Sequence, residues 1–333
     1  MCHSALSSRV CLCVVITISF ATIPRARAQA PAGCSFQIFP LTYQTSSPLD
    51  VESLTPFAMN DFLTIVGDSH SVNNARPDGG FIRWPNGSVQ LTSKFQSTVG
   101  LHLVDRNNNG AMVGWFAHNN QQNPVIITGA ITTPSIVEAN VLIGALFLRY
   151  YVATAINDWT SVVGYYEDSS NIYHGIKRYS DRYVSMPSDS VGLCNEVNCP
   201  GIQLDFPGAA NGTGSGTQPL GINDSGVVVG LEGSPNNFHG FIYLGGNWAK
   251  LDFPSSLHTA LTGISNDGTI IGMGNVGDQP VCFMYRHGLF KTISPPNANC
   301  SALRDIGLRT NLILGEAYYP ATATSKVFIA KCQ

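Results

Sequence analysis

The segment Gly221-Ile222-Asn223-Asp224-Ser225-Gly226-Val227-Val228-Val229-Gly230, with His239-Gly240-Phe241-Ile242-Tyr243 after it, contains three features that recur along the chain. These are an Asn/Asp-rich turn, a short apolar run that ends in glycine, and an aromatic segment. A second copy begins Gly263-Ile264-Ser265-Asn266-Asp267-Gly268-Thr269-Ile270-Ile271-Gly272. Asn, Asp and Gly tolerate positive φ, so each turn is predicted to close a β-hairpin. Such self-similarity predicts a repeat architecture.

The glycine that ends the apolar run recurs with spacings of 47, 50, 66, 42 and 43 residues, at Gly67, Gly114, Gly164, Gly230, Gly272 and Gly315. A polar loop follows each glycine, and after it we expect a third strand. The expected third strands are 80–84, 125–128, 174–179, 239–243, 282–285 and 327–330. A fourth strand is expected to end at proline, as in Trp248–Pro254 and Phe290–Pro295, because proline cannot serve the interior of a ladder.

Four strands in a repeated unit of about 42–50 residues predict an all-β fold, a six-bladed β-propeller with four-stranded blades. The sixth unit stops at Gln333 after its third strand, while Cys34–Pro40 has the pattern of an isolated fourth strand. We therefore expect the N-terminal strand to complete the last blade and close the ring. A seven-bladed propeller and a linear β-solenoid remain alternatives.

Two regions depart from the repeat. The apolar run Val141–Leu148 is interpreted as one buried outer strand, because it is too short to span a membrane. The longest spacing contains an insertion at about 180–201. The fourth strand of the third blade is either Arg182–Pro187 or Gln203–Pro207, and we favour the second because it matches Lys250–Pro254.

Residues 1–28 have the features of a secretory signal: Arg9, an apolar stretch and a cleavage site of small residues after Ala28. Residues 29–333 would then form a single propeller domain in a secreted protein, either extracellular or periplasmic. Loss of the signal removes three arginines and no acid, which changes the formal net charge from −3 to −6. The mature chain has no basic stripe, so nucleic acid is excluded as a partner, and no membrane insertion is expected.

The mature chain contains six cysteines, an even number that agrees with export. If Cys34 lies on the closing strand and Cys332 ends the neighbouring strand, a disulfide between them would staple the ring shut. The entropic model gives such a long loop a stabilisation of about 4–5 kcal/mol. Cys194 with Cys199 would pin the insertion, which leaves Cys282 to pair with Cys300.

Several motifs resemble catalytic or metal-binding sites. Asp105-x-Asn107-x-Asn109-Gly110 resembles the start of a calcium loop, but Phe116 stands at the twelfth position, where an acid is required. We interpret this segment as a hairpin turn and keep calcium as an alternative. His174 and His239 share one repeat position, where a structural role is expected. No catalytic residue, metal site or cofactor is assigned.

The phrases Gly-Ile-Asn-Asp-x-Gly, Val-Val-Gly, His-Gly-Phe-Ile-Tyr and Leu204-Asp205-Phe206-Pro207-Gly208 together resemble the HAF repeat family of probable extracellular repeats in bacteria. The match is good in the third to fifth units and partial in the others. The tripeptide that names the family appears here as His-Gly-Ile at 174–176 and His-Gly-Phe at 239–241. The resemblance implies a secreted, propeller-like protein and brings no established activity.

We therefore expect a non-catalytic binding or scaffold protein whose partner is an extracellular protein or a glycan. The candidate ligand-face aromatics follow the repeat glycines and are Trp115, Tyr165, Tyr166, Tyr318 and Tyr319. Packing between blades is the alternative role for these side chains. The alternative function is a glycoside hydrolase or lyase acting on polysaccharide, with two of the acids Glu167, Glu232 and Glu316 converging as a catalytic pair.

Overall fold

The computed structural model describes residues 33–44, 51–72, 78–92, 100–118, 121–128, 135–138, 141–143, 146–148, 151–179 and 199–333. Every regular element in these ranges is a β-strand, and none is an α-helix. It follows that these ranges hold no helix with the length and apolarity needed to cross a bilayer. The signal at 1–28 and nearly all of the insertion at 180–201, including the alternative strand Arg182–Pro187, lie outside the described residues.

The strands form antiparallel units, each in chain order except the last. Unit 1 contains β3 (Val51–Met59), β4 (Ile65–Ser71), β5 (Gly79–Arg83) and β6 (Val89–Leu91), and β2 (Thr42–Gln44) pairs with β3. Unit 2 contains β7 (Leu101–Arg106), β8 (Met112–His118), β9 (Gln121–Thr128) and β10 (Ser135–Glu138). Unit 3 contains β13 (Val152–Ile156), β14 (Val162–Glu167), β15 (Tyr173–Arg178) and β16 (Cys199–Leu204).

The second half of the chain continues this pattern. Unit 4 contains β17 (Gly216–Ile222), β18 (Val228–Ser234), β19 (Asn237–Leu244) and β20 (Asn247–Lys250). Unit 5 contains β21 (Ser256–Ile264), β22 (Ile270–Val276), β23 (Gln279–Arg286) and β24 (Leu289–Thr292). Unit 6 contains β25 (Asn299–Ile306), β26 (Leu312–Tyr319) and β27 (Thr324–Cys332), completed by β1 (Cys34–Pro40). One bridging pair, Tyr173 with Gly216, joins units 3 and 4 into a larger sheet.

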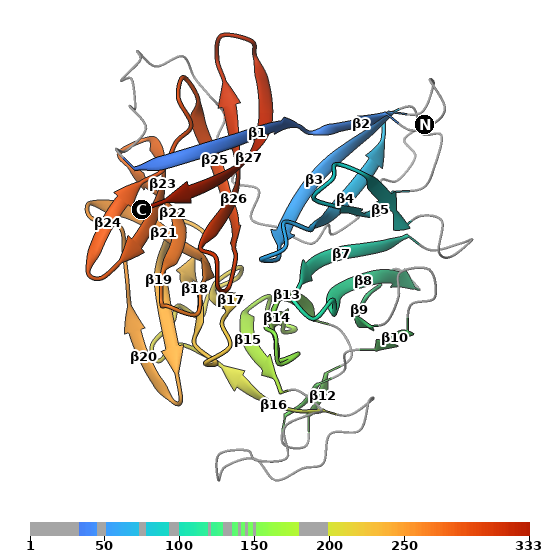
Figure 1. The fold of residues 1–333 in the computed structure, drawn as a ribbon. Helices are drawn as coiled ribbons and strands as arrows, with labels where there is room; N and C mark the ends of the chain where they lie inside the picture. The colour runs from blue at the N-terminus through green and yellow to red at the C-terminus, as the bar shows by residue number, and fades with distance from the viewer. Residues whose placement is uncertain are drawn as a thin grey trace, which may run out of the picture.

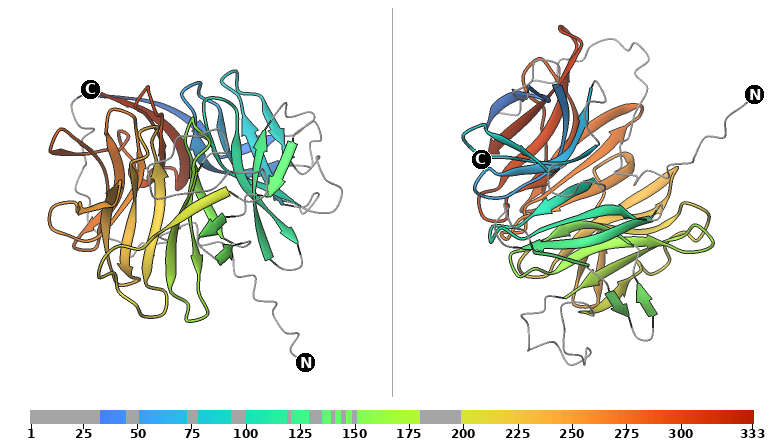
Figure 2. Two further views of the ribbon diagram at one scale, coloured as in Figure 1. Left: turned by 90° about the horizontal axis from the view of Figure 1, so that it is seen from below. Right: turned by 90° about the vertical axis from the view of Figure 1, so that its right-hand side faces the viewer.

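The units are arranged around a centre like the blades of a propeller, with the first strand of each innermost (Figures 1 and 2). The apolar core is divided among neighbouring units: Ile271 of β22, for example, shares a cluster with Ile306 of β25 and Phe328 of β27. In Figure 1 the N-terminal strand β1 lies beside β27 and leads into β2 beside β3. The predicted pairing of 34–40 with the last strand is thereby confirmed.

The repeat glycine leaves room for a carbonyl of the first strand in all six units and, in units 1, 4, 5 and 6, also for a phenylalanine ring of the third strand. Gly230 lies opposite Phe241, and a Cβ at Gly230 would lie 2.2 Å from the Gln218 carbonyl oxygen and 2.8 Å from the Phe241 ring. Gly272 and Gly315 face Phe283 and Phe328 in the same way. The aromatic ring fills the space that glycine leaves, so the two parts of the repeated phrase form one packing unit.

The segment 141–148 differs from its prediction as one strand. The structure forms a hairpin there, with β11 (Val141–Ile143) antiparallel to β12 (Leu146–Leu148). β11 adds in parallel to the edge of β16, outside the four strands of unit 3, as the peripheral strands in Figure 2 indicate. A single strand of this length would expose an unpaired edge, and folding back halves that edge. The outer strand of unit 3 is β16, which pairs with β15, but it overlaps the favoured segment Gln203–Pro207 only at residues 203–204. The fourth strands β20 and β24 likewise end three or four residues before the prolines at which they were expected to end.

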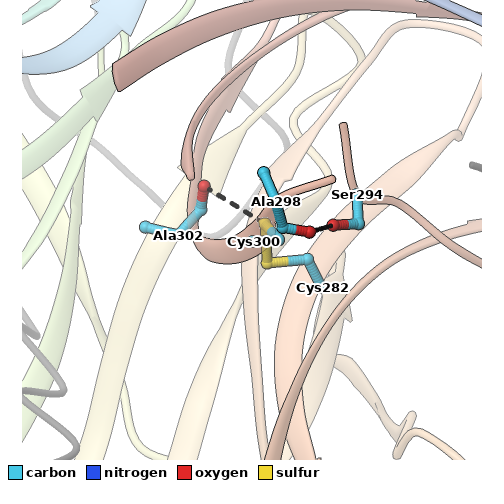
Figure 3. Close-up of a disulfide and its surroundings, with 5 residues drawn as sticks. All are labelled: Cys282, Ser294, Ala298, Cys300 and Ala302. Carbon is cyan, nitrogen blue, oxygen red and sulfur yellow. Dashed lines mark hydrogen bonds between the residues drawn. A yellow bond between two sulfur atoms is a disulfide. The ribbon is translucent and has the colours of Figure 1, made fainter. Parts of the chain in front are cut away.

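Two of the three predicted disulfides are present. Cys34 bonds to Cys332, 298 residues away, and their Cα atoms are 4.1 Å apart. Cys282 of β23 bonds to Cys300 of β25, next to a turn in which the Ser294 hydroxyl donates to the Ala298 carbonyl at 2.7 Å (Figure 3). The predicted pairing of Cys194 with Cys199 cannot be followed, because Cys194 lies outside the described residues. Disulfides of this kind are typical of proteins that mature in an oxidising compartment.

Candidate functional site

A belt of asparagine side chains joins neighbouring units at the end of the molecule where first and second strands meet. We call this end the Asn/Asp face; it consists of the turns 60–64, 107–111, 157–161, 223–227, 265–269 and 307–311. In each of four turns the asparagine amide donates to a carbonyl of the next turn: Asn60 to Asn107 (3.3 Å), Asn107 to Asn157 (2.9 Å), Asn157 to Asn223 (3.0 Å) and Asn223 to Ser265 (3.0 Å). The same asparagines accept a backbone N–H four residues ahead, from Thr64, Ala111, Ser161 and Val227.

A second set of hydrogen bonds involves the residue directly after the asparagine in each of these turns. The backbone N–H of Asp61, Asn108, Asp158 and Asp224 donates to the side chain at the equivalent position of the next unit, at 2.8–2.9 Å. In unit 6 the turn begins with Gly307, where a Cβ would lie 2.6 Å from the Asp61 carboxylate. Asp61 instead accepts the N–H groups of Arg309 and Thr310, at 3.0–3.1 Å. The last turn is therefore degenerate because it receives a carboxylate from the first.

The first strand of each of the six units contains a β-bulge close to the Asn/Asp face. The residues that follow the bulge line a central cavity of about 40 Å³ and are Ala58, Asp105, Ala155, Gly221, Gly263 and Asp305. A bulge re-aims the side chain that follows it, which brings these positions to the centre. The cavity has room for a few water molecules and is too small for a sugar ring.

The two axial carboxyl groups also tie units together. Asp105 accepts N–H groups from Ile156 of unit 3 (2.7 Å) and from Arg106 (2.6 Å). Asp305 likewise accepts from Met59 of unit 1 (2.8 Å) and from Ile306 (2.7 Å). Burial raises the pKa of Asp105 from 3.8 to about 7, against the lowering effect of its two N–H donors. Burial, and then the neighbouring Asp105, raise the pKa of Asp305 well above its usual value.

Two turns of the Asn/Asp face expose an aromatic ring. Phe62 and Trp159 follow Asp61 and Asp158 and are 64% and 50% exposed. The residues after them, Leu63 and Thr160, have positive φ values of 61° and 64°. Gly110, Gly226 and Gly268 stand at the equivalent position, with φ of 87°, 78° and 82°. Positive φ is unfavourable for a bulky or β-branched residue, so these two turns hold strain that the glycine turns avoid.

A polar floor connects the two aromatic turns. The Asn108 amide donates both to Asp61 (2.7 Å) and to Asp158 (3.0 Å). The guanidinium of Arg309, on a side chain that is 65% exposed, reaches Asp158 at 2.8 Å. We call the set Phe62, Trp159, Asp61, Asn108, Asp158 and Arg309 the aromatic-floor site. The sequence contains a signal for this site, because these two turns have Leu63 and Thr160 where three of the others have glycine.

The five predicted ligand-face aromatics lie on β8, β14 and β26, in three units, toward the end opposite the Asn/Asp face. Trp115 stacks on His102 with ring centroids 3.8 Å apart, and Tyr166 stacks on His174 at 5.1 Å. Tyr165 is buried and contacts Tyr173 edge-on. Tyr318 and Tyr319 end β26, and Lys326 lies over the Tyr319 ring. A ligand role for these five side chains stays a prediction.

The repeated histidine pairs with a second repeated residue. His239 Nδ1 lies 2.8 Å from the carboxylate of Asp252, and His174 Nδ1 lies 2.9 Å from that of Asp205. Both aspartates belong to the Leu-Asp-Phe-Pro phrase, at or directly after the end of the fourth strand. In units 3 and 4 the two phrases are thus joined by a histidine–aspartate hydrogen bond.

The other candidates for chemistry are engaged in structural contacts. In the calcium-like segment, Asp105 accepts backbone bonds, while Asn107 and Asn109 donate to carbonyls of unit 3 at 2.9 and 2.8 Å. Glu232 pairs with Lys250, and Glu316 with Arg304 at 3.0 Å. Glu167 ends β14 and is exposed. The ranges that the model describes contain no group of three or more His, Cys, Asp or Glu suited to a metal ion.

Comparison with known proteins assigns no family. No family model and no curated protein matches the chain. Among solved structures, a protein assigned as a gluconolactonase is 10% identical with a TM-score of 0.47, covering 91% of this chain and 94% of that one. The sialidase of Trypanosoma rangeli is 8% identical with a TM-score of 0.47, covering 91% of this chain and 60% of its own. These values are too low to support a functional assignment.

Proposed function

We propose that the protein is a secreted, non-catalytic, six-bladed β-propeller that binds carbohydrate at the aromatic-floor site. The proposed blade count is supported by the six inner strands, which share one bulge position and line one cavity. β1 would complete the last blade through its pairing with β27. Membership of the HAF repeat family stays a prediction that rests on the repeated phrases. Secretion is supported by the two disulfides and by the features of residues 1–28.

One observation carries the binding proposal. Two turns of the Asn/Asp face hold a leucine or a threonine at positive φ, and these same two turns expose an aromatic ring. Strain that persists in a stable fold is concentrated at functional sites. An aromatic ring that projects into solvent offers a flat apolar surface, and carboxylates, an amide and a guanidinium between two such rings offer acceptors and donors for hydroxyl groups. That mixture suits a glycan better than a protein partner, whose interface core would be depleted in charge.

The polar floor is preorganised. Asp61, Asn108 and Asp158 are held by the belt, and each has at least two hydrogen bonds inside the protein. A ligand that binds there does not have to order these side chains, which lowers the entropic cost of association. The axial cavity below the floor is too small for a sugar, so the proposal places the ligand on the surface of the face.

The test is binding to a glycan array and to a panel of insoluble polysaccharides, by the wild type and by Phe62→Ala/Trp159→Ala. Truncation of two aromatic anchors is expected to weaken binding at least about 100-fold. Leu257→Ala is the matched control: Leu257 is 66% exposed but begins β21, at the opposite end of the molecule, and its loss should leave binding unchanged.

Three results would contradict the proposal. Binding that survives the double variant would move the site elsewhere, for example to Trp115 and Tyr166. Hydrolysis of a polysaccharide that is abolished by Glu→Gln changes at Glu167, Glu232 or Glu316 would show an enzyme. Binding of protein ligands alone would replace the glycan by a protein partner.

A further inference from the structure

A second cavity, separate from the aromatic-floor site, lies beneath the N-terminal strand where units 1 and 6 meet. Its volume is about 170 Å³. One wall is formed by Phe39, Leu41 and Tyr43 from the chain that passes from β1 to β2. The opposite wall is formed by the buried side chains of Leu54, Ile65 and Phe81.

Arg83 is the only charged residue that lines this cavity. Its guanidinium lies over the ring of Phe39, 4.4 Å from the centroid. A guanidinium held over a ring face keeps its N–H donors at the edge, where they can bind a planar anion. The N-terminal strand therefore positions the arginine and also leaves its donors available.

No carboxylate pairs with Arg83 in the part of the chain that the structure describes. Arg304, Arg286 and Arg309, by contrast, each lie within 3.0 Å of a Glu or Asp oxygen. Burial lowers the pKa of Arg83, and no neighbouring acid offsets this. A partly buried cation without an anion is unfavourable, and a bound carboxylate would relieve that cost.

We propose that this cavity is a binding site for a small apolar carboxylate, with Arg83 holding the carboxylate and the walls holding the apolar part. An apolar cavity of about 150 Å³ accommodates benzene, so the ligand is about the size of benzoate or hexanoate. A free acid and the C-terminal residue of a peptide present this same chemistry. The site is independent of the proposed glycan binding, because it shares no residue with the aromatic-floor site.

The test compares acids with neutral counterparts of the same shape by isothermal titration calorimetry up to 10 mM ligand. Benzoate and hexanoate are measured against benzamide and hexanamide. Acetyl-Gly-Leu is measured against its C-terminal amide, which tests the peptide source. The wild type is expected to bind at least one acid about ten-fold or more tightly than its amide, since a bidentate arginine contact is lost in the amide.

The variants then locate the site. Arg83→Gln should reduce the acid-to-amide ratio to about one, and Arg83→Lys should give an intermediate ratio, because it keeps the charge but not the fork. Arg286→Gln, on unit 5, should keep the wild-type ratio. Equal binding of acid and amide, an unchanged ratio in Arg83→Gln, or no binding of either at 10 mM would each overturn the proposal. If Arg83→Gln does not fold, the acid-to-amide ratio of Arg83→Lys decides, and a wild-type ratio in that variant would overturn the proposal.

Discussion

At the scale of single residues, the repeated asparagine has two tasks that no other side chain combines at this position. In Asn223, the amide nitrogen donates to Ser265 of the next unit while the amide oxygen accepts from Val227 of its own turn. Serine, as at Ser265, keeps the turn but does not extend the belt by its side chain. The residue type thus specifies both the hairpin and the contact between units.

Asn223→Asp tests this dual role. The carboxylate keeps the acceptor but has no donor for the Ser265 carbonyl, and it places a buried charge beside that oxygen. We expect the free energy of unfolding to fall by about 2 kcal/mol or more in urea titrations at pH 7. Asn247→Asp is the control, because Asn247 is exposed and its amide only contacts Leu244 at 3.4 Å. Equal effects at the two positions would refute the belt as a source of stability.

At the scale of elements, the inner strands combine one geometry with different axial residues. The bulge is repeated in β3, β7, β13, β17, β21 and β25, yet only β7 and β25 place an acid at the centre. Each acid accepts a backbone N–H from the unit that follows it. The strands therefore share their shape, and the acids add contacts at two of the seams between units.

The pKa of Asp105 predicts a pH dependence of stability. Because the pKa is about 7 in the folded state and 3.8 in the unfolded state, the folded protein binds about one more proton between these values. The contribution of this group is fully present below pH 4 and is lost as the pH rises to 7. Wild-type stability should thus decrease from pH 4 to pH 7 relative to Asp105→Asn, measured by urea unfolding across this range.

Asp267→Asn provides the opposite case. Hydrogen bonds from Ser265, Thr269 and Asn311 outweigh the effect of burial and hold the pKa of Asp267 below its usual value. Its contribution is present above pH 4 and is lost at lower pH. The difference between wild type and Asp267→Asn should therefore change below pH 4 and stay constant from pH 4 to 7. For Asp105, a stability difference between the wild type and Asp105→Asn that stays constant from pH 4 to 7 would contradict the raised pKa of this group.

At the scale of the whole molecule, the first and the last described strands meet in unit 6. The bond between Cys34 and Cys332 joins residues 298 apart, whereas Cys282 and Cys300 are 18 apart. β1 also pairs with β27 along its whole length, from Cys34 to Pro40. The disulfide thus constrains the unfolded chain, and the strand pairing constrains the folded one.

Removal of the two disulfides should have different effects. Loop entropy predicts a loss of about 6 kcal/mol for Cys34→Ser/Cys332→Ser and about 3 kcal/mol for Cys282→Ser/Cys300→Ser. Guanidinium unfolding measures both values. In the first variant, amide hydrogen exchange of residues 34–40 should also accelerate relative to β21, because the seam opens locally. A larger loss for the short loop, or unchanged exchange in β1, would show that the bond does not stabilise the closure.

The sequence alone predicted most of the inner elements of each unit and the contact between Cys34 and Cys332, but not the hairpin at 141–148 or the ends of the fourth strands. Turn chemistry and apolar patterning located the third strands of every unit, and the chain ends identified Cys34 with Cys332. These features depend on neighbouring residues, or on the symmetry of the repeat. The hydrogen bonds of the asparagine belt follow the same repeat. They connect residues that are 47, 50, 66 and 42 apart, which are the spacings of the repeat glycines.

Only the tertiary structure decided which side chains meet. Three contacts join residues from different units: the approach of Asp105 to Asp305, the bonds from Asn108 to both Asp61 and Asp158, and the placement of Arg83 over Phe39. Periodicity assigns a residue to a strand or a turn, but such contacts depend on how the bulged inner strands turn their side chains and on where the N-terminal strand crosses the seam. Those depend on how the units pack around the common centre, which no local pattern contains.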